Sequence, residues 1–288
     1  MPADFKPFDK AEWLRLEKKA DELRRLTVQT TVWGGSGHIG GAMSAMDAMT
    51  ILYHRFMKLD VNNPDMEDRD RFVLSKGHCT PALYSTMAQR GFFPLEELKQ
   101  FRRIEGHMSG HAEMRHVKGV DMSTGSLGQG ISAAVGMALA GKADGRDYRV
   151  YALLGDGEIE EGQVWEAAMA AAKYRLDNLC AVVDVNGLQI DGATADVMPS
   201  EPLDQKFEAF NWNVIRVDGH DYAALAEAFA AAAACKGKPT VLLARTVKGK
   251  GVSFMEGDYG WHGKAPNAAQ YEKARAELAA RVAALEGK

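Results

Sequence analysis

The sequence has few of the features that mark membrane, secreted or nucleic-acid-binding proteins. Its 288 residues include only three cysteines, Cys79, Cys180 and Cys235, whose wide separation argues against a disulfide framework or a cysteine metal site. No apolar run approaches the roughly 18 residues that a membrane helix needs, and the charged amino terminus is unlike a signal peptide. The net charge of -4 provides no basic face for nucleic acid. We therefore expect a cytoplasmic protein with neither a membrane nor a polyanionic partner.

Apolar residues make up 46% of the chain, enough for a full core, and they alternate between two spacings. Helical spacing at residues 9–33 and about 44–56 predicts two helices before the first strand. Apolar runs typical of buried strands lie at 72–75, 148–154, 179–185, 212–217 and 240–246. Helical segments separate the later strands, and one of these segments is the alanine-rich stretch 221–234. This alternation predicts an α/β fold, a doubly wound and mostly parallel sheet with helices on both faces.

A glycine-rich segment without apolar periodicity covers residues 246–266. It follows a predicted strand and precedes a final helix that begins near Asn267. Long loops of this kind are more often functional than structural.

The sequence Gly155-Asp156-Gly157 ends one predicted strand and opens a helix, and Asn186 ends the next strand. A right-handed crossover brings both strand ends to one edge, so Asp156 and Asn186 should be neighbours. A helix that opens with glycines suits a phosphate group. The oxygens of Asp156, Asn186 and the Leu188 carbonyl would suit Mg²⁺, or else Ca²⁺ or Mn²⁺. Alone, this motif is often only a turn, but its spacing to Asn186 is typical of thiamine diphosphate sites.

Five blocks of sequence resemble the N-terminal part of transketolases, in order and over nearly the whole chain. They are SGHIGGAMSA at 36–45, SKGH at 75–78, GHAE at 110–113, TGSLGQG at 124–130 and GDGEIEEGQVWEA at 155–167. VDVNGLQIDG and WHGKAP extend the similarity. The resemblance implies that residues 1–288 form a single domain that binds the diphosphate of thiamine diphosphate, with an N-terminal helical segment and a C-terminal helix.

The resemblance also implies roles for individual residues. Histidines at matching positions line the substrate channel of transketolases, which implies catalytic roles for His38, His111 and His262, while His78 would contact the cofactor diphosphate. Cofactor contacts are further implied for Gly125, Ser126, Leu127, Gly155, Gly157, Glu161, Asn186, Ile190 and His262. Glu161 matches a glutamate in a carboxylate network that spans two subunits.

Two positions depart from the family, because Ile39 and Ser126 stand where transketolases commonly have proline. Neither change removes a ligand atom. We interpret Glu158 and Glu160 as ordinary charges of a first helical turn, where the helix dipole favours acids. The remaining histidines, His54, His107, His116 and His220, have no support from the blocks and are interpreted as structural.

The activity that the resemblance implies is transfer of a two-carbon ketol unit from a ketose to an aldose. The glutamate that activates the cofactor in this family has no counterpart in the chain. We therefore expect a partner subunit carrying a pyrimidine-binding domain, in an α2β2 heterotetramer. The helix at 128–142, rich in alanine and glycine, is a candidate for close packing against the partner or, equally, for burial on its own sheet.

Two other functions remain open from the sequence. One is the alpha subunit of a thiamine-dependent 2-oxo acid dehydrogenase, against which the SKGH and WHG histidines weigh. The other is a cofactor-binding module without catalysis. The sugar is also open, and a pentose phosphate, apulose phosphate or a sulfonated sugar would each fit.

Overall fold

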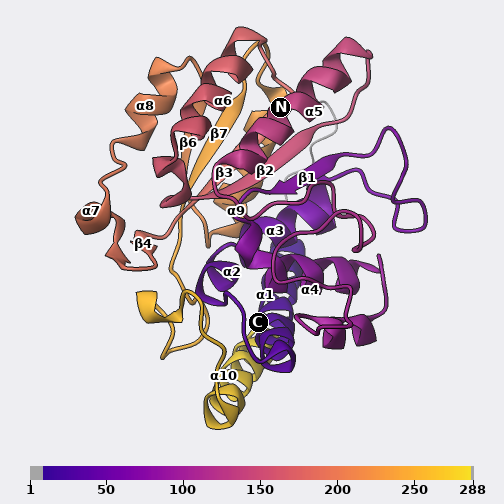
Figure 1. Ribbon diagram of the computed structural model, residues 1–288, viewed down its shortest axis with the longest axis vertical. Coiled ribbons are helices and arrows are strands. Elements are labelled where there is room, and N and C mark those ends of the chain that lie inside the picture. The colour runs from indigo at the N-terminus through magenta and orange to yellow at the C-terminus, as the bar shows by residue number, and fades with distance from the viewer. Residues whose placement is uncertain (1–8, 287–288) are drawn as a thin grey trace.

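A five-stranded sheet forms the centre of the protein (Figure 1). The structure is a computed structural model and describes residues 9–286. The strands, in the order of the sheet, are β1 (Arg71–Leu74), β2 (Val150–Gly155), β3 (Leu179–Val185), β7 (Thr240–Arg245) and β6 (Asn213–Asp218). Every neighbouring pair is parallel, which confirms the predicted sheet and its strand positions to within a few residues.

The register of the strands brings their carboxyl ends to one edge. Gly155 of β2 lies opposite Asp184 of β3, and Val185 lies opposite Arg245 of β7. The segments that leave these strands therefore begin side by side, at the edge where open parallel sheets bind ligands.

Helices cover both faces of the sheet, as the sequence predicted. One face packs against α1 (Lys10–Gly34), α3 (Met46–Ile51), α4 (Thr80–Arg90) and α9 (Tyr222–Ala234). The other packs against α5 (Gln129–Ala143), α6 (Gly162–Lys173) and α8 (Leu203–Ala209). Strand residues alternate between the two cores: Tyr151 and Leu153 point to the first, Ala152 and Leu154 to the second.

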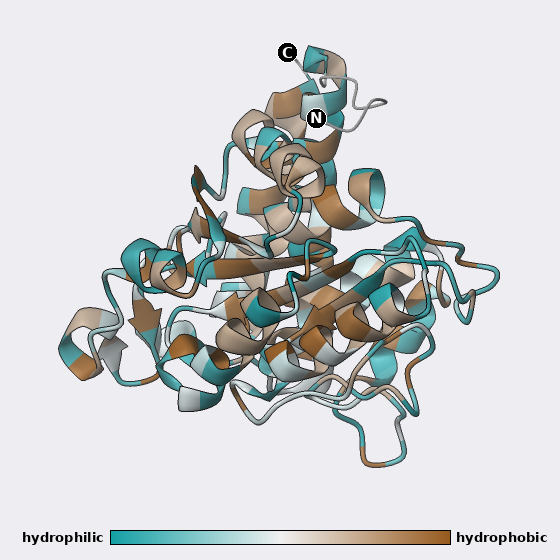
Figure 2. Ribbon diagram, turned by 90° about the horizontal axis from the view of Figure 1, so that it is seen from above, coloured by the Kyte–Doolittle hydropathy of each residue, from teal (hydrophilic) through white to brown (hydrophobic). Residues whose placement is uncertain are grey.

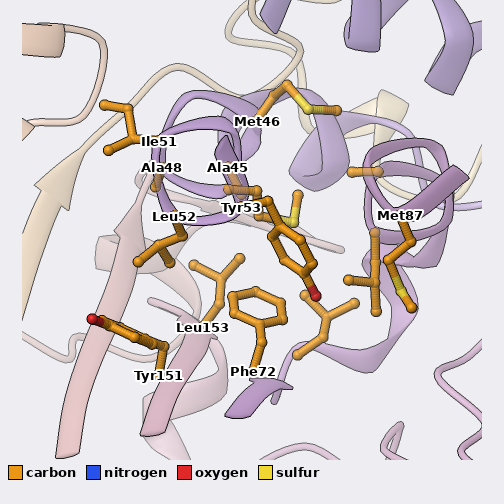
Figure 3. Packing of buried hydrophobic residues seen from close by; sticks show 14 of the residues in the cluster. Ala45, Met46, Ala48, Ile51, Leu52, Tyr53, Phe72, Met87, Tyr151 and Leu153 are labelled. Carbon is orange, nitrogen blue, oxygen red and sulfur yellow. The ribbon is translucent and has the colours of Figure 1, made fainter. Parts of the chain in front are cut away.

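The first core is dense around the N-terminal helices. Figure 3 shows Leu52 and Tyr53 packed against Phe72, Tyr151 and Leu153 of the sheet. In Figure 2 the strands are largely hydrophobic and lie between helices of mixed character. This burial fixes the strand ends that carry the site.

The glycine-rich segment at 246–266 is a loop, as expected, and it is anchored by a third core. Its residues Val252, Met255 and Trp261 are buried against α1 and against α10 (Ala268–Glu286). A short 3-10 helix at Tyr259–Trp261 is the loop's one helical turn among the described residues. The loop is therefore held on both sides, by β7 at its start and by this core at its end.

Several elements differ from the prediction. The helix expected at about 44–56 is divided into α2 (Gly40–Ser44), α3 and a π-helical turn at Leu52–Phe56. The helix α4 was not predicted. The remaining elements are 3-10 turns at Gly77–Cys79, Leu95–Gln100 and Glu158–Glu160, the hairpin β4 (Leu188–Gln189) and β5 (Gly192–Ala193), and α7 (Thr194–Val197).

Helix α5 covers nearly all of the segment 128–142, for which packing against a partner and burial on its own sheet were both expected. Ile131, Ala134 and Ala138 are buried in the core beneath it. The opposite side of the helix is exposed at Gly136 and Leu139. Burial on its own sheet thus accounts for one face only.

Among the described helices, none has the length and apolar character needed to cross a membrane.

Candidate active site

A cavity of about 200 Å³ opens at the carboxyl edge of the sheet. Its walls come from α2 and from the segments that follow β1, β2, β3 and β7. They are lined by Gly41, Lys76, His78, Leu127, Gly155, Asp156, Gly157, Glu158, Glu160, Asn186, Leu188, Gln189, Ile190, Asp191, Val197, Lys248 and His262. Residues far apart in the sequence thus meet at the place where the crossover geometry predicted a ligand.

The structure brings the three expected metal ligands together. The Asp156 carboxylate accepts hydrogen bonds from the backbone N–H groups of Gly157, at 3.0 Å, and Gly187, at 2.5 Å. The amide oxygen of Asn186 accepts the N–H of Leu188 at 3.1 Å. These contacts orient a carboxylate and an amide oxygen on adjacent strand ends. Within the described chain, no group of three His, Cys, Asp or Glu side chains could hold a metal, and the expected set contains only one such side chain.

Among the described residues, neither Asp156 nor Lys248 forms an ion pair at this site. Burial and the neighbouring Asp184 carboxylate raise the pKa of Asp156 to about 6. Burial and the nearby Lys76 ammonium lower the pKa of Lys248 to about 8. Both shifts disfavour the charged forms. The site therefore fits a divalent cation beside Asp156 and an anion beside Lys248, which together would match a metal-bound diphosphate.

Lys76 and Lys248 were not identified from the sequence, although both lie in segments that were singled out. The Lys76 ammonium is fully buried and pairs with Asp184 at 2.5 Å, and this carboxylate outweighs burial to raise its pKa above the ordinary value. The Lys248 ammonium donates to the Leu188 carbonyl at 3.0 Å. Lys76 is the lysine of the SKGH block, two positions before His78, so this block could have identified it as a site residue.

Four histidine rings meet beside the cavity. The ring centroid of His38 lies 5.1 Å from that of His78, 5.7 Å from that of His111 and 5.4 Å from that of His262. Burial lowers the pKa of His38 to about 4 and that of His262 to about 3, with Arg102 and Lys248, respectively, as the largest charged contributors. These two imidazoles are therefore neutral at pH 7.

Hydrogen bonds indicate which nitrogen of each ring carries the proton. The Nδ1 atom of His38 lies 3.4 Å from Nη2 of Arg102, and Nδ1 of His262 lies 3.1 Å from Nζ of Lys248. Because guanidinium and ammonium groups only donate, both Nδ1 atoms accept. The proton of each neutral ring is then on Nε2, which can donate to a ligand oxygen.

Arg102 is a further site residue that the sequence analysis missed. Its backbone is in the left-handed region, with φ of 54°. A side chain at Gly110 would clash with Nε of Arg102, so this glycine makes room for the guanidinium. Within residues 9–286, the buried Nε atom has no hydrogen-bond partner.

The TGSLGQG segment contributes to two adjacent hollows. Leu127 lines the main cavity, whereas Gly125 and Ser126 line a neighbouring pocket together with His111. Gly125 has φ of 153°, and a Cβ there would lie 2.9 Å from the His111 ring. Ile190 is 64% exposed at the cavity.

The glutamates after β2 require one correction. Glu158 is 2% exposed, and its carboxylate accepts from Ser75 Oγ at 2.5 Å and from the N–H groups of Gly128 at 3.1 Å and Gly155 at 3.0 Å. Its interpretation as an ordinary helix-turn charge is wrong, because it ties together the segments after β1 and β2 and the start of α5. Glu160 is partly buried and lines the cavity, and Glu161 is exposed.

Comparisons with known proteins identify the family of the chain. Residues 16–283 match the family described as transketolase, thiamine diphosphate binding domain. The chain is 46% identical over 263 residues to the 6-deoxy-6-sulfo-D-fructose transketolase subunit SqwG of Clostridium sp. (strain MSTE9), covering 91% of this chain and 96% of that protein. It is 41% identical over 271 residues to one subunit of the apulose-4-phosphate transketolase of Phocaeicola vulgatus, covering 94% and 96%.

Solved structures give the same fold. The transketolase of Campylobacter jejuni superposes with a TM-score of 0.86 at 33% identity, over 92% of this chain and 42% of that one. The transketolase of Leishmania mexicana superposes with a TM-score of 0.83 at 31% identity, over 94% of this chain and 45% of that one. The chain thus spans less than half the length of these solved enzymes.

The chain belongs to the transketolase family, and its fold is the thiamine diphosphate binding domain of these transferases. Within the family it corresponds to the separate N-terminal subunit of a split transketolase, because it matches such subunits over almost their entire length. The family match favours a transketolase over the alpha subunit of a 2-oxo acid dehydrogenase.

Proposed function

We propose that this chain binds thiamine diphosphate through Mg²⁺ and, with a partner subunit, transfers a two-carbon ketol unit from a ketose to an aldose. The observation that carries the proposal is that Asp156 and Asn186 line one cavity, with two of the four clustered histidines in its wall and the other two beside it. The first two suit a metal-bound diphosphate, and the histidines suit the hydroxyl groups of a sugar.

Residues of this chain would hold the cofactor at its diphosphate end. The metal ligands would be the Asp156 carboxylate, the Asn186 amide oxygen and the Leu188 carbonyl, a set of hard oxygens that Mg²⁺ prefers and that Ca²⁺ or Mn²⁺ would also accept. Lys248 and His78 lie beside these ligands and would contact the diphosphate. When bound, thiamine diphosphate supplies the electron sink for breaking and forming the carbon–carbon bond.

The histidines would position the sugar and move its protons. The neutral Nε2–H groups of His38 and His262 can donate to the carbonyl oxygen of the donor ketose and polarise it. His111 is exposed beside them and can reach a hydroxyl further along the sugar. Because Nε2 of His38 and His262 carries the proton in this tautomer, each ring could give that proton to a substrate oxygen and take one back only afterwards.

The relatives point to the class of sugar. Their names give 6-deoxy-6-sulfo-D-fructose and apulose 4-phosphate as substrates of those enzymes. Both sugars carry an anionic group at the end distant from the reacting carbonyl. We propose an anionic sugar of this kind for this chain as well, with apulose phosphate, a sulfonated sugar and a pentose phosphate as the three candidates.

The partner would carry the pyrimidine-binding domain, and we propose an α2β2 assembly in the cytoplasm with residues 1–288 as one domain. Two relatives are named as subunits, which supports the need for a partner. The exposed face of α5, the exposed Ile190 at the cavity and the exposed Glu161 before α6 are surfaces on which a second chain could close the site.

The test is reconstitution with the purified partner. The complex, with thiamine diphosphate and Mg²⁺, is assayed with three donors: a ketopentose phosphate, apulose 4-phosphate and 6-deoxy-6-sulfofructose. The expected result is ketol transfer from at least one donor by the complex and none by either chain alone, with light scattering giving the mass of two copies of each. Full activity of the lone chain would overturn the split enzyme. A complex that oxidises 2-oxo acids and transfers no ketol unit would overturn the reaction.

A further inference from the structure

We propose that His220 is a positioning residue of the active site, which holds the start of the 246–266 loop so that Lys248 and His262 face the cavity. The proposal rests on the function proposed for that cavity and adds a residue that lines no part of it. His220 follows β6, and its side chain is 15% exposed. Its own N–H group donates to Asp218 at 2.9 Å, which fixes the backbone there.

The two ring nitrogens of His220 join two separate parts of the fold. Nδ1 lies 2.6 Å from Oδ2 of Asp47 on α3. Nε2 accepts the backbone N–H of Val247 at 2.9 Å. The imidazole is therefore a bridge between the helical layer and the first residues after β7.

The partners determine the tautomer of this ring. Asp47 is buried and accepts from Arg24 Nη2 at 2.5 Å and from the Tyr222 hydroxyl, so it is a carboxylate anion and cannot donate. The Nδ1 atom of His220 must then donate to it. The Val247 N–H can only donate, so Nε2 must accept. A single neutral tautomer satisfies both contacts, and the Asp47 network holds it rigidly.

The hydrogen bond that fixes Val247 also restricts the position of the next residue, Lys248. Thr246 is tied to β3 through its N–H, which donates to the Val185 carbonyl at 3.1 Å. Lys248 then reaches the Leu188 carbonyl at 3.0 Å and His262 Nδ1 at 3.1 Å. Because Val247 lies directly between these two anchored residues, loss of its hydrogen bond would loosen the Lys248 side of the cavity first.

Two substitutions separate the two contacts. His220→Gln can place its amide oxygen near the position of Nε2 and keep an acceptor for Val247. His220→Asn can place its amide near the position of Nδ1 and keep a donor to Asp47, but it leaves the Val247 N–H without an acceptor. Tyr222→Phe is the matched control, since it removes a different hydrogen bond to Asp47 and does not touch the loop.

Three measurements are made on the isolated full chain and on the reconstituted complex: hydrogen exchange of residues 246–262, affinity for thiamine diphosphate with Mg²⁺, and the separate kcat and KM of ketol transfer. We expect His220→Asn to speed exchange in the loop and to lower cofactor affinity about tenfold, the effect of one lost hydrogen bond. The cofactor affinity of His220→Gln should stay within about threefold of the parent's. Tyr222→Phe should lower the unfolding temperature without changing loop exchange or affinity.

The proposal would be overturned if hydrogen exchange in the loop were equally fast in His220→Asn and His220→Gln. It would also be overturned if exchange were faster in His220→Asn while cofactor affinity and turnover stayed unchanged. Both outcomes would leave His220 with a role in stability only. Loop exchange is measured without cofactor or partner. A parental complex that transfers no ketol unit would therefore refute the proposed function without deciding the role of His220.

Discussion

The substitution Asp156→Asn separates the stability of this chain from its ability to bind a metal. The carboxylate is 3% exposed and accepts two backbone N–H groups. Its raised pKa of about 6 corresponds to roughly 3 kcal/mol against ionisation at pH 7. Asparagine removes that charge and keeps the shape, but it leaves one N–H facing an amide group, which costs about 1–3 kcal/mol. The metal-free variant should therefore be as stable as the parent at pH 7, or slightly more stable.

The sign of the pH dependence follows from the direction of the shift. Because the folded-state pKa of Asp156 lies above the unfolded value, the folded chain binds more protons between the two values, and its stability falls as pH rises from about 4 to about 6. The burial cost is small at pH 4 and nearly complete at pH 7. The unfolding temperature of Asp156→Asn relative to the parent should thus rise by about 4 °C over this range for a chain of 288 residues.

The assay is thermal unfolding in a metal chelator at both pH values, and then at pH 7 with thiamine diphosphate and Mg²⁺. Ligand at 100 times its Kd should raise the parent's unfolding temperature by about 4 °C and leave Asp156→Asn unchanged. Asp191→Asn, an exposed carboxylate that lines the same cavity, is the control and should respond like the parent. An undiminished ligand response in Asp156→Asn would refute the metal assignment. If the difference in unfolding temperature between Asp156→Asn and the parent did not change with pH, the argument that burial raises the pKa of Asp156 would be refuted.

Two further predictions concern the histidines and the buried ion pair. His38→Ala should retain cofactor affinity while reconstituted turnover falls by the order of 10², because its proposed role is on the sugar, and His262→Ala should lower turnover to a similar extent; parental rates in both variants would contradict this role. Asp47→Asn should lower the free energy of unfolding in urea by about 3 kcal/mol, because it removes one of the two carboxylates that pair with the buried Arg24 guanidinium and leaves only Asp21. Asp204→Asn, which breaks an exposed pair with Arg216, should cause no measurable change, and equal effects of the two substitutions would show that burial of the pair does not matter.

The parts of the site that could be predicted are those that depend on local pattern. Each strand is a short apolar run, and parallel strands joined by a crossover must end at one edge. Asp156 and Asn186 could therefore be placed together from the sequence, and the structure joins their segments by the bond from Gly187 N–H to Asp156. The sheet order could not be predicted, because β6 and β7 give no local sign of which one lies next to β3.

Residues whose role depends on distant contacts were missed. Glu158 looks like a helix-turn acid in the sequence, yet one of its partners, Ser75, is 83 positions away. Arg102 lies in a segment without periodicity and depends on the space left at Gly110. Helix α4 was missed for a different reason: the residues from Thr80 to Ala88 are buried on all sides, so the helix has no polar stripe to reveal its period.

The arrangement of charges in the site favours ligand binding more than it favours the stability of the chain alone. Lys76 and Asp184 neutralise one another in the interior, and further hydrogen bonds from Ser44 and Asn186 satisfy that carboxylate. Asp156 and Lys248 have no such mutual pairing, and each is held where burial disfavours its charge. A cation beside one and an anion beside the other would remove both penalties together. Under the proposed function, burial would make the binding of metal and diphosphate interdependent, because either ion alone would leave the opposite charge of the site uncompensated.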